Sequence, residues 1–449
     1  MATISALGIG SGLDLNGLLD ELEVAERHKL APLTQQKNSY EAKISSYGKL
    51  KSALTQFQAA AGKLSEAEAF KGVKSTVTGS ALGATAGSGA GAGTFQVEVV
   101  ELARASSVAT AGIADKGANL GGGTIAFELG NGESFSVEID AQNSSLEKIR
   151  DAINAADGGV RASIVNDGSG TPYRLVLAAA QTGTEGAVAS VDFGDLAASL
   201  DIDPGTAVEA RDASLTVNGI AISSQSNQVS DAIEGVTLNL LETGSATVTV
   251  AADTQAVKDG IKGFVTAYNN LQATIAGLTS YDAASGVAGD LLGDATLRSI
   301  QSRLRGAMAG GVGGGEIQRL ADIGIKLEVN GTLKVDDAKL DAAISGKSLA
   351  LTNFFAGSDG ADGLADELDD FLGQILKSGG PLDNATKGLD ASVKRLDERY
   401  LNMEKSINVT IARYRAQFSQ LDVMIASMNS TSSYLTQQFD MLNAQLNAK

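Results

Sequence analysis

The glycine cluster near the start of the chain is the first candidate for chemistry. Gly8-Ile-Gly10-Ser-Gly12 precedes a predicted helix and superficially resembles a phosphate-binding loop. It lacks a preceding strand, the six-residue dinucleotide spacing and the lysine of a P-loop. We therefore expect residues 4–12 to form a flexible apolar arm that becomes ordered on assembly.

A second candidate is the acidic segment that begins Asp201-Ile-Asp203 and continues to Asp212. It echoes a calcium-binding loop, but Thr206 stands at the sixth position, where such a loop has glycine. We interpret this segment as a solvated acidic loop.

The acids between Asp362 and Asp370 could supply a carboxylate pair for glycoside hydrolysis. The apolar residues interleaved with them, such as Leu364 and Leu368, have helical spacing. The acids are therefore expected to form the wet face of an amphipathic helix.

Composition excludes much other chemistry. The chain has no cysteine, and its one histidine, His28, lies among charged residues of a predicted helix surface. Imidazole catalysis, a thiol nucleophile and thiolate or multi-histidine metal sites are excluded on this basis. We predict a protein that is not an enzyme, with no cofactor and no metal.

The net charge of −18 is unevenly distributed. Residues 1–72 are neutral and residues 385–449 carry +2, so the acidic excess lies between them. Neutral ends suit packing against other chains, while an acidic middle argues against nucleic acid as a partner. The start resembles no Sec signal peptide, and no stretch is apolar enough for membrane insertion. These rules alone predict a cytoplasmic protein unless a dedicated export machine reads another signal.

The two ends of the chain carry long amphipathic patterns. Asp14 is a predicted N-cap, Pro32 is expected to end or kink the first helix, and a second helix follows over 40–64. From Leu389 to Leu446 apolar residues recur at spacings of three and four, a pattern that predicts a helix about 90 Å long. So narrow a stripe needs partner helices, and each end is the nearest partner for the other.

We predict that the two ends bind partners through the apolar seam of these helices. The predicted seam residues are Leu15, Leu18, Leu22, Leu396, Ile407, Ile411, Tyr414, Phe418, Leu421, Ile425, Met428, Leu435, Phe439 and Leu442.

The middle of the chain is predicted to be rich in strands. Residues 79–93, dominated by Gly and Ala, are expected to be a linker, with strands from Phe95 onward. Hairpins are predicted over 124–139 and at Asn218-Gly219. Ser144 with Glu147 is predicted to form the capping box of a short helix.

A weak echo links Asp151-Ala-Ile-Asn with Asp231-Ala-Ile-Glu, since each follows a strand and a polar loop and precedes another strand. It raises the hypothesis of two copies of one strand–helix–strand unit. Further helices are predicted over 253–278 and 297–308, and another hairpin at Asn330-Gly331.

Several short motifs follow one another along nearly the whole chain. They are Ile4-Ser-Ala-Leu-Gly-Ile-Gly-Ser-Gly-Leu-Asp14, Ala25-Glu-Arg27, Pro32-Leu33, the helix Tyr40–Leu54, Asp151–Asn154, Ala162–Asp167, Tyr173–Leu177, Asp212–Gly219, Gly235–Leu238, Phe264–Asn270 and Gly331–Leu333. In this order they resemble the flagellar hook-associated protein 2 family, the FliD family of filament-capping proteins. One departure is Ala288–Gly293, where the family is expected to have a Gly-Pro pair.

The resemblance implies a secreted structural protein at the tip of the bacterial flagellum, exported unfolded by the flagellar type III apparatus. It implies a homo-oligomeric cap of about five or six copies that promotes folding and insertion of flagellin and prevents its loss. The implied partners are flagellin, filament-end subunits, hook–filament junction proteins and a cytoplasmic export chaperone at the C-terminal helix.

The predicted fold class is α+β and multidomain, with long terminal coiled-coil helices, a helix-and-hairpin domain and inserted β-rich head domains. Residues 1–72 with 380–449 are predicted to form the leg, and 251–379 the helix-and-hairpin domain. The head is predicted over 73–104 with 206–250, with residues 105–205 as an inserted outer domain.

Two alternative functions remain open. The acidic head could be an adhesin for host glycans or mucin, in addition to capping. It could also be a glycosidase using head carboxylates, which a polysaccharide assay would test.

Overall fold

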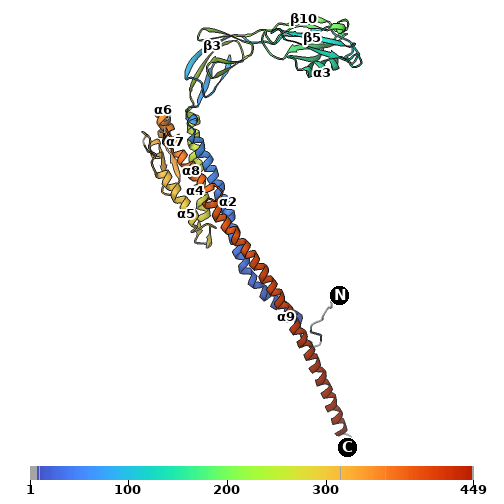
Figure 1. Ribbon diagram of the computed structural model, residues 1–449, viewed down its shortest axis with the longest axis vertical. Helices are drawn as coiled ribbons and strands as arrows, with labels where there is room; N and C mark the ends of the chain where they lie inside the picture. The colour runs from blue at the N-terminus through green and yellow to red at the C-terminus, as the bar shows by residue number, and fades with distance from the viewer. Residues whose placement is uncertain (1–7, 10, 314, 359, 447–449) are drawn as a thin grey trace. The chain divides into compact units, whose positions relative to one another are not determined.

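The computed structural model (Figure 1) describes residues 8, 9, 11–313, 315–358 and 360–446. Most of the predicted N-terminal arm, residues 4–7 and 10, therefore lies outside the described residues. The chain forms two units, Met1–Ala67 with Lys258–Lys449 and Glu68–Val257. Mixed helix and sheet confirm the predicted fold class, with long helices at both ends and a β-rich middle.

The first unit is mainly helical. Its helices are α1 (Leu15–Arg27), α2 (Ala31–Ser65), α4 (Thr254–Thr279, in this unit from residue 258), α5 (Ala295–Ala309), α6 (Asp337–Gly346), α7 (Ser348–Ala356), α8 (Leu364–Leu376) and α9 (Pro381–Leu446). Short 3-10 turns span His28–Leu30 and Leu320–Ile323, and two hairpins join β16 (Tyr281–Asp282) to β17 (Val287–Ala288) and β18 (Ile325–Leu327) to β19 (Leu333–Val335).

Helix α4 supplies the centre of this unit's core. The four-three spacing puts its large apolar residues on one face, and in this unit Ile261, Phe264, Tyr268, Leu271, Ile275 and Leu278 are all buried. Phe57 of α2 packs against Phe264 and Tyr268 of α4, with ring centroids 5.3 and 5.6 Å apart. Phe355 of α7 closes the cluster at 6.1 Å from Phe264. The predicted helices over 253–278 and 297–308 are confirmed.

Two hydrogen bonds tie α2 to the segment that leads into α5. Ser46 donates to Asp290 and the Tyr47 hydroxyl donates to Asp294, both at 2.7 Å. The other carboxylate oxygen of Asp294 accepts the backbone N–H of Leu297 and so caps α5. Burial, together with the neighbouring Asp294, raises the pKa of Tyr47 to about 12.

The second unit contains two lobes with separate cores. The base lobe consists of β1 (Val73–Thr78), β2 (Leu82–Ala86), β3 (Gly93–Glu101), β11 (Ala213–Val217), β12 (Ile220–Ser224), β13 (Gln228–Ile233), β14 (Val236–Leu240) and β15 (Gly244–Ala252). They form an antiparallel five-stranded sheet in the order β1-β15-β3-β11-β12 and a three-stranded sheet β13-β14-β2. The 3-10 turn Ala67–Phe70 leads into this unit.

The inserted lobe consists of β4 (Ser107–Thr110), β5 (Gly123–Leu129), β6 (Ser134–Ile139), α3 (Leu146–Ala156), β7 (Val160–Asn166), β8 (Tyr173–Ala179), β9 (Val188–Asp192) and β10 (Ile202–Val208), with a 3-10 turn at Gly194–Ala198. Its antiparallel sheets run β10-β4-β8-β7 and β6-β5-β9. Figure 1 shows α3 beside the strands of this lobe. Its buried Leu146, Ile149 and Ile153 join their core.

The predicted hairpins are confirmed. In the β5–β6 hairpin Phe127 pairs with Phe135, and their rings stack 4.8 Å apart. Asn218 and Gly219 both have positive φ, 49° and 84°, as a two-residue type I′ turn requires.

Two predictions about small-residue and acidic segments are wrong. The expected linker 79–93 contains β2, in which Leu82 is buried and pairs with Leu240 of β14. Small side chains are tolerated in β2 because the larger side chains of its neighbour β14, Val236, Leu238 and Leu240, contribute to the core. Asp203 lies in the edge strand β10, not in a solvated loop, and accepts a 2.8 Å bond from Arg174.

The predicted capping box and repeat are also corrected. Ser145, not Ser144, caps α3 by accepting the N–H of Lys148, while the Ser144 hydroxyl accepts the N–H groups of Leu120 and Gly121. Asp231 lies within strand β13 at φ 64°, so the second copy of the supposed strand–helix–strand unit has no helix. Val229 and Ile233 pair with β14 on either side of a register shift, and this pairing keeps the segment extended.

Helix boundaries at the chain ends differ slightly from expectation. Pro32 lies in the first turn of α2, where its missing N–H has no helical partner to lose. Helix α9 begins at Pro381, eight residues before the predicted stripe, and extends for 66 residues. Within the described residues, no helix is both long and apolar enough to cross a membrane.

Candidate partner-binding surface

The first part of α9 is covered by the chain's own N-terminal helices. Leu19 of α1 and Leu30 form a buried cluster with Ile407 and Ile411, against which Tyr400, Tyr414 and Phe418 are partly buried. Figure 1 shows α2 alongside α9. The expected pairing of the two chain ends with each other is confirmed.

Polar contacts fix the register of this antiparallel pairing. Lys37 Nζ lies 2.6 Å from Asp397 Oδ1, and Arg27 lies 3.8 Å from Glu404. Further along, the backbone N–H of Ser11 donates to Asp422 Oδ1 at 2.7 Å. Residue numbers fall from 37 to 27 to 11 on the N-terminal segment as they rise from 397 to 404 to 422 on α9, so the two segments run in opposite directions.

The structure divides the predicted seam residues into three groups. Leu15, Leu396, Ile407 and Ile411 are buried within the chain, whereas Leu22, Tyr414, Phe418 and Ile425 are partly buried. The remaining six are exposed: Leu18, Leu421, Met428, Leu435, Phe439 and Leu442. The seam of α9 is therefore covered within the chain as far as Ile411, and its exposed apolar residues lie mainly beyond that point.

The last part of α9 has no cover from the rest of the described chain. Every described side chain from Ser427 to Ala444 is exposed, including Leu435 at 49%, Phe439 at 65% and Leu442 at 57%. We refer to residues 427–444 of α9 as the uncovered segment. Isolated exposed apolar residues are ordinary, but a run of them along one helix indicates an interaction surface.

The exposed apolar surface is wider than the predicted seam. Val423, Met424, Tyr434 and Met441 are 56–68% exposed and lie outside the predicted stripe. The sequence indicates this wider surface through the doublets Tyr434-Leu435 and Met441-Leu442. Adjacent apolar residues on a helix point to different sides, so they extend the apolar surface beyond a single stripe.

Charge is scarce on this surface. Between Phe418 and Leu446 the only charged residues are Asp422 and Asp440. A helix this poor in charge offers partners mainly apolar contact, as helix-in-groove docking requires.

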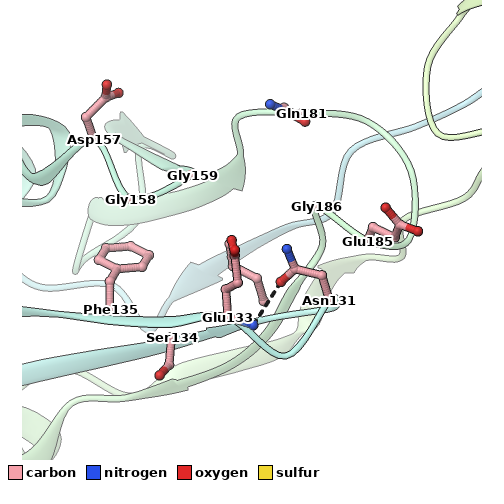
Figure 2. A pocket seen from close by; sticks show the side chains of 11 residues that line it. Asn131, Glu133, Ser134, Phe135, Asp157, Gly158, Gly159, Gln181, Glu185 and Gly186 are labelled. Carbon is pink, nitrogen blue, oxygen red and sulfur yellow. Dashed lines mark hydrogen bonds between the residues drawn. The ribbon is translucent and has the colours of Figure 1, made fainter.

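The inserted lobe contains a cavity of about 640 Å³ (Figure 2), lined partly by Glu133, Phe135, Asp157 and Glu185. Its carboxylates would be the candidates for the glycosidase reading. Asp157 is 76% exposed and paired with Arg161 at 2.7 Å. A general acid for glycoside cleavage needs a desolvated carboxyl group. The carboxylate of Asp157 is exposed to solvent, so it does not meet this requirement.

Other predicted chemical sites have structural roles. Four of the five acids predicted for this helix, Asp366, Glu367, Asp369 and Asp370, lie on α8, whose Leu364, Leu368 and Leu372 are buried, so the amphipathic interpretation is confirmed for them. Asp362 precedes the helix. His28 is exposed in a 3-10 turn. In the described ranges no three His, Asp or Glu side chains converge as metal ligands.

Comparison with known proteins places these features in a family. Patterns described as flagellar hook-associated protein 2 N-terminus and C-terminus match residues 11–106 and 210–430. "Flagellar hook-associated protein 2" of Escherichia coli K12 is 38% identical, covering 98% of this chain and 99% of its own length. The chain belongs to the flagellar hook-associated protein 2 family. A pattern described as flagellin hook IN motif matches residues 124–181, within the inserted lobe.

Other relatives agree with this assignment. Flagellar hook-associated protein 2 of Salmonella typhimurium LT2 is 39% identical over 99% of this chain and all of its own length. The crystal structure titled flagellar cap protein FliD D1-D2-D3 domains from Escherichia coli matches with a TM-score of 0.63 at 34% identity. It covers 77% of this chain and 99% of the solved one.

Proposed function

We propose that this chain is the subunit of a flagellar filament cap. Its copies form an oligomer at the filament tip, promote folding and insertion of exported flagellin, and prevent loss of flagellin subunits. Family membership supports this function, and the observation that carries its mechanism is the uncovered segment of α9. A segment without cover in its own chain has apolar surface left to bury against filament subunits.

The covered and uncovered parts of α9 have different roles, the first in folding of the chain and the second in binding of partners. Leu19, Ile407 and Ile411 keep the upper part of the leg folded in the single chain. The uncovered segment binds helices of filament-end subunits and, before export, a cytoplasmic chaperone. Both partners bury the same apolar residues, so they compete and the chaperone must leave before capping.

A cap must hold the filament tip and yet move as flagellin is added. Several legs that each make a modest contact give high total avidity, while a single leg can still release. The near absence of charge on the uncovered segment suits this requirement, because apolar contact is non-directional and permits a partner helix to be exchanged.

We further propose that the chain is secreted by the flagellar export apparatus and meets hook–filament junction proteins before the filament grows. A chain without cysteine forms no disulfide during such passage. The adhesin reading of the acidic head stays a hypothesis, for which a glycan array with the full chain is the test.

The cap function is tested by complementation. In a flagellated strain that lacks its own cap protein, the full chain should restore filaments, while a Phe439→Asp variant should release flagellin into the medium. Gln437→Asp is the matched control, since it adds the same charge to the same exposed segment two residues away. Filaments of normal length with Phe439→Asp, or equal loss with Gln437→Asp, would contradict the proposed mechanism.

A further inference from the structure

The two lobes of the second unit are joined by two stretches of chain that run side by side. The base lobe continues into the inserted lobe at Arg104 and returns at Arg211, and these residues exchange backbone hydrogen bonds of 2.9 and 3.0 Å. A two-stranded connection of this kind can bend, because a few backbone angles at one place can absorb a rotation.

A third connection joins the lobes away from this crossing. Residues 182–185 of the inserted lobe contact Asp212 and Gln225 of the base lobe. Thr184 donates both its N–H and its hydroxyl to Asp212 Oδ1, at 2.7 and 3.0 Å. Glu185 N donates to Gln225 Oε1 at 3.0 Å, and Thr182 Oγ1 donates to the Gln225 carbonyl at 2.7 Å.

The two base-lobe side chains also bond to each other. Gln225 Nε2 donates to Asp212 Oδ2 at 3.0 Å. Both oxygens of Asp212 and both polar atoms of the Gln225 amide are therefore engaged at once. Bonds to the charged carboxylate are stronger than neutral ones, and each group holds the other in its rotamer.

Close backbone approach makes this contact specific. Gly183 has φ 88°, and a Cβ there would lie 2.2 Å from Gln225 Oε1 and 2.6 Å from the Gln225 carbonyl oxygen. Only glycine permits both the backbone conformation and the approach.

The same loop is fixed on its other side to the β5–β6 hairpin of the inserted lobe. Asn131 N donates to Glu185 O at 2.9 Å and Gly130 N donates to Ala187 O at 2.8 Å. Figure 2 shows Asn131 and Glu185 close together at the edge of the cavity. The loop therefore connects a rigid hairpin of one lobe directly to the sheet ends of the other.

We propose that Asp212, Gln225 and the Gly183 loop form a clasp that locks the orientation of the inserted lobe on the base lobe. With the clasp closed, the crossing at Arg104 and Arg211 cannot act as a hinge, and the unit moves as one body. When the clasp opens, each lobe keeps its own core and the angle between them varies.

The test measures the distance between the lobes in the full chain. The protein lacks cysteine, so Ile220→Cys on the base lobe and Val165→Cys on the inserted lobe, 69% and 47% exposed, accept spin labels specifically. Labelled protein is mixed with excess unlabelled chain, so that any assembly carries one labelled copy, and the distance distribution is recorded by double electron–electron resonance.

A single narrow distribution is expected for the parent chain, broadening about twofold or more in Asp212→Ala, Gln225→Ala and Gly183→Ala, as in a freed hinge. Asp195→Ala and Gln228→Ala are matched controls, exposed residues of the same unit outside the clasp, and should leave the distribution narrow. Near-ultraviolet circular dichroism should be unchanged in all variants, because neither core is touched. A broad distribution in the parent, a narrow one in the clasp variants, or broadening in the controls would each overturn the proposal.

Discussion

The division of α9 into covered and uncovered parts predicts that substitutions at two places on one helix will affect different properties. In the uncovered segment they should weaken partner binding, and in the covered part they should lower the free energy of unfolding. The perturbation is a triple variant, Leu435→Gln, Phe439→Gln and Leu442→Gln, in the uncovered segment. Glutamine is chosen because it is a good helix former, so the helix itself should persist. Ile407→Ala, in the cluster with Leu19, is the contrasting variant.

The expected size of each effect follows from burial. The three residues are 49%, 65% and 57% exposed, so docking can still bury about half or more of each side chain. Complete burial of a Leu or Phe side chain is worth about 1.5–3 kcal/mol, which leaves roughly 1–2 kcal/mol for each residue here. The triple variant should lose about 3–6 kcal/mol of binding free energy, or roughly 10² to 10⁴ in affinity.

The free energy of unfolding should show the reverse order, with a large loss in Ile407→Ala and little change in the triple variant. Ile407 is 2% exposed, and its truncation to alanine should lower the free energy of unfolding by about 2–5 kcal/mol. The triple variant should change that free energy by no more than about 0.5 kcal/mol per site, as at other exposed positions. Denaturant unfolding of the purified chains measures both values.

Binding is measured by sedimenting each chain with sheared flagellar filaments over a range of concentrations, and function by complementation of a strain that lacks its cap. The triple variant should bind weakly and give no filaments, although it unfolds like the parent. The reasoning is refuted if the triple variant binds filaments as tightly as the parent, or if its unfolding free energy falls as far as that of Ile407→Ala.

Three further predictions follow from the geometry. Phe418→Asp or Leu421→Asp, beyond the buried part of the seam, should abolish capping in the complementation assay while circular dichroism of the β-rich unit stays unchanged; normal filaments would contradict this. Arg174 depresses the pKa of Asp167 to about 2, below the ordinary 3.8, so its contribution to stability is present above about pH 4 and lost as the pH falls towards 2. Asp167→Asn should therefore flatten the acid unfolding curve of the chain in that window, and a curve as steep as the parent's would contradict the assignment. Burial and the neighbouring Asp294 raise the pKa of Tyr47 to about 12, so Tyr47 contributes stability that is complete below pH 10 and lost as the pH rises to about 12. Tyr47→Phe should reduce the fall in melting temperature between those values, and an identical fall would contradict the raised pKa of Tyr47.

Local patterns in the sequence were sufficient wherever the physical cause was itself local. The four-three spacing of α4 put large apolar residues such as Phe264, Tyr268 and Leu271 on one face whatever they pack against, and these residues are buried. Asn218-Gly219 specified its turn because both residues tolerate positive φ. Motif order along the chain was also sufficient for the family, because it depends on residue identity alone.

Pairing between distant segments was not predictable in this way. Strand β2 was missed because its Gly and Ala residues carry little strand signal, and only β14, about 150 residues away in the chain, gives it a place in a sheet. The segment around Asp231 was misread for the same reason, since its echo of the helical segment at Asp151 gave no sign of the pairing with β14. Ser144 and Ser145 are equivalent caps by type, and the contact of Ser144 with Leu120 decided between them.

The seam of α9 separates what each level determines. Its sequence by itself determined that a long helix would carry an apolar stripe from one end to the other, because spacing alone fixes which residues share a face. Only the tertiary structure decided where that stripe is satisfied within the chain and where it is left for partners. The N-terminal helices are too short to follow α9 to its end, so apolar residues of the same stripe are core at Ile407 and exposed at Phe439.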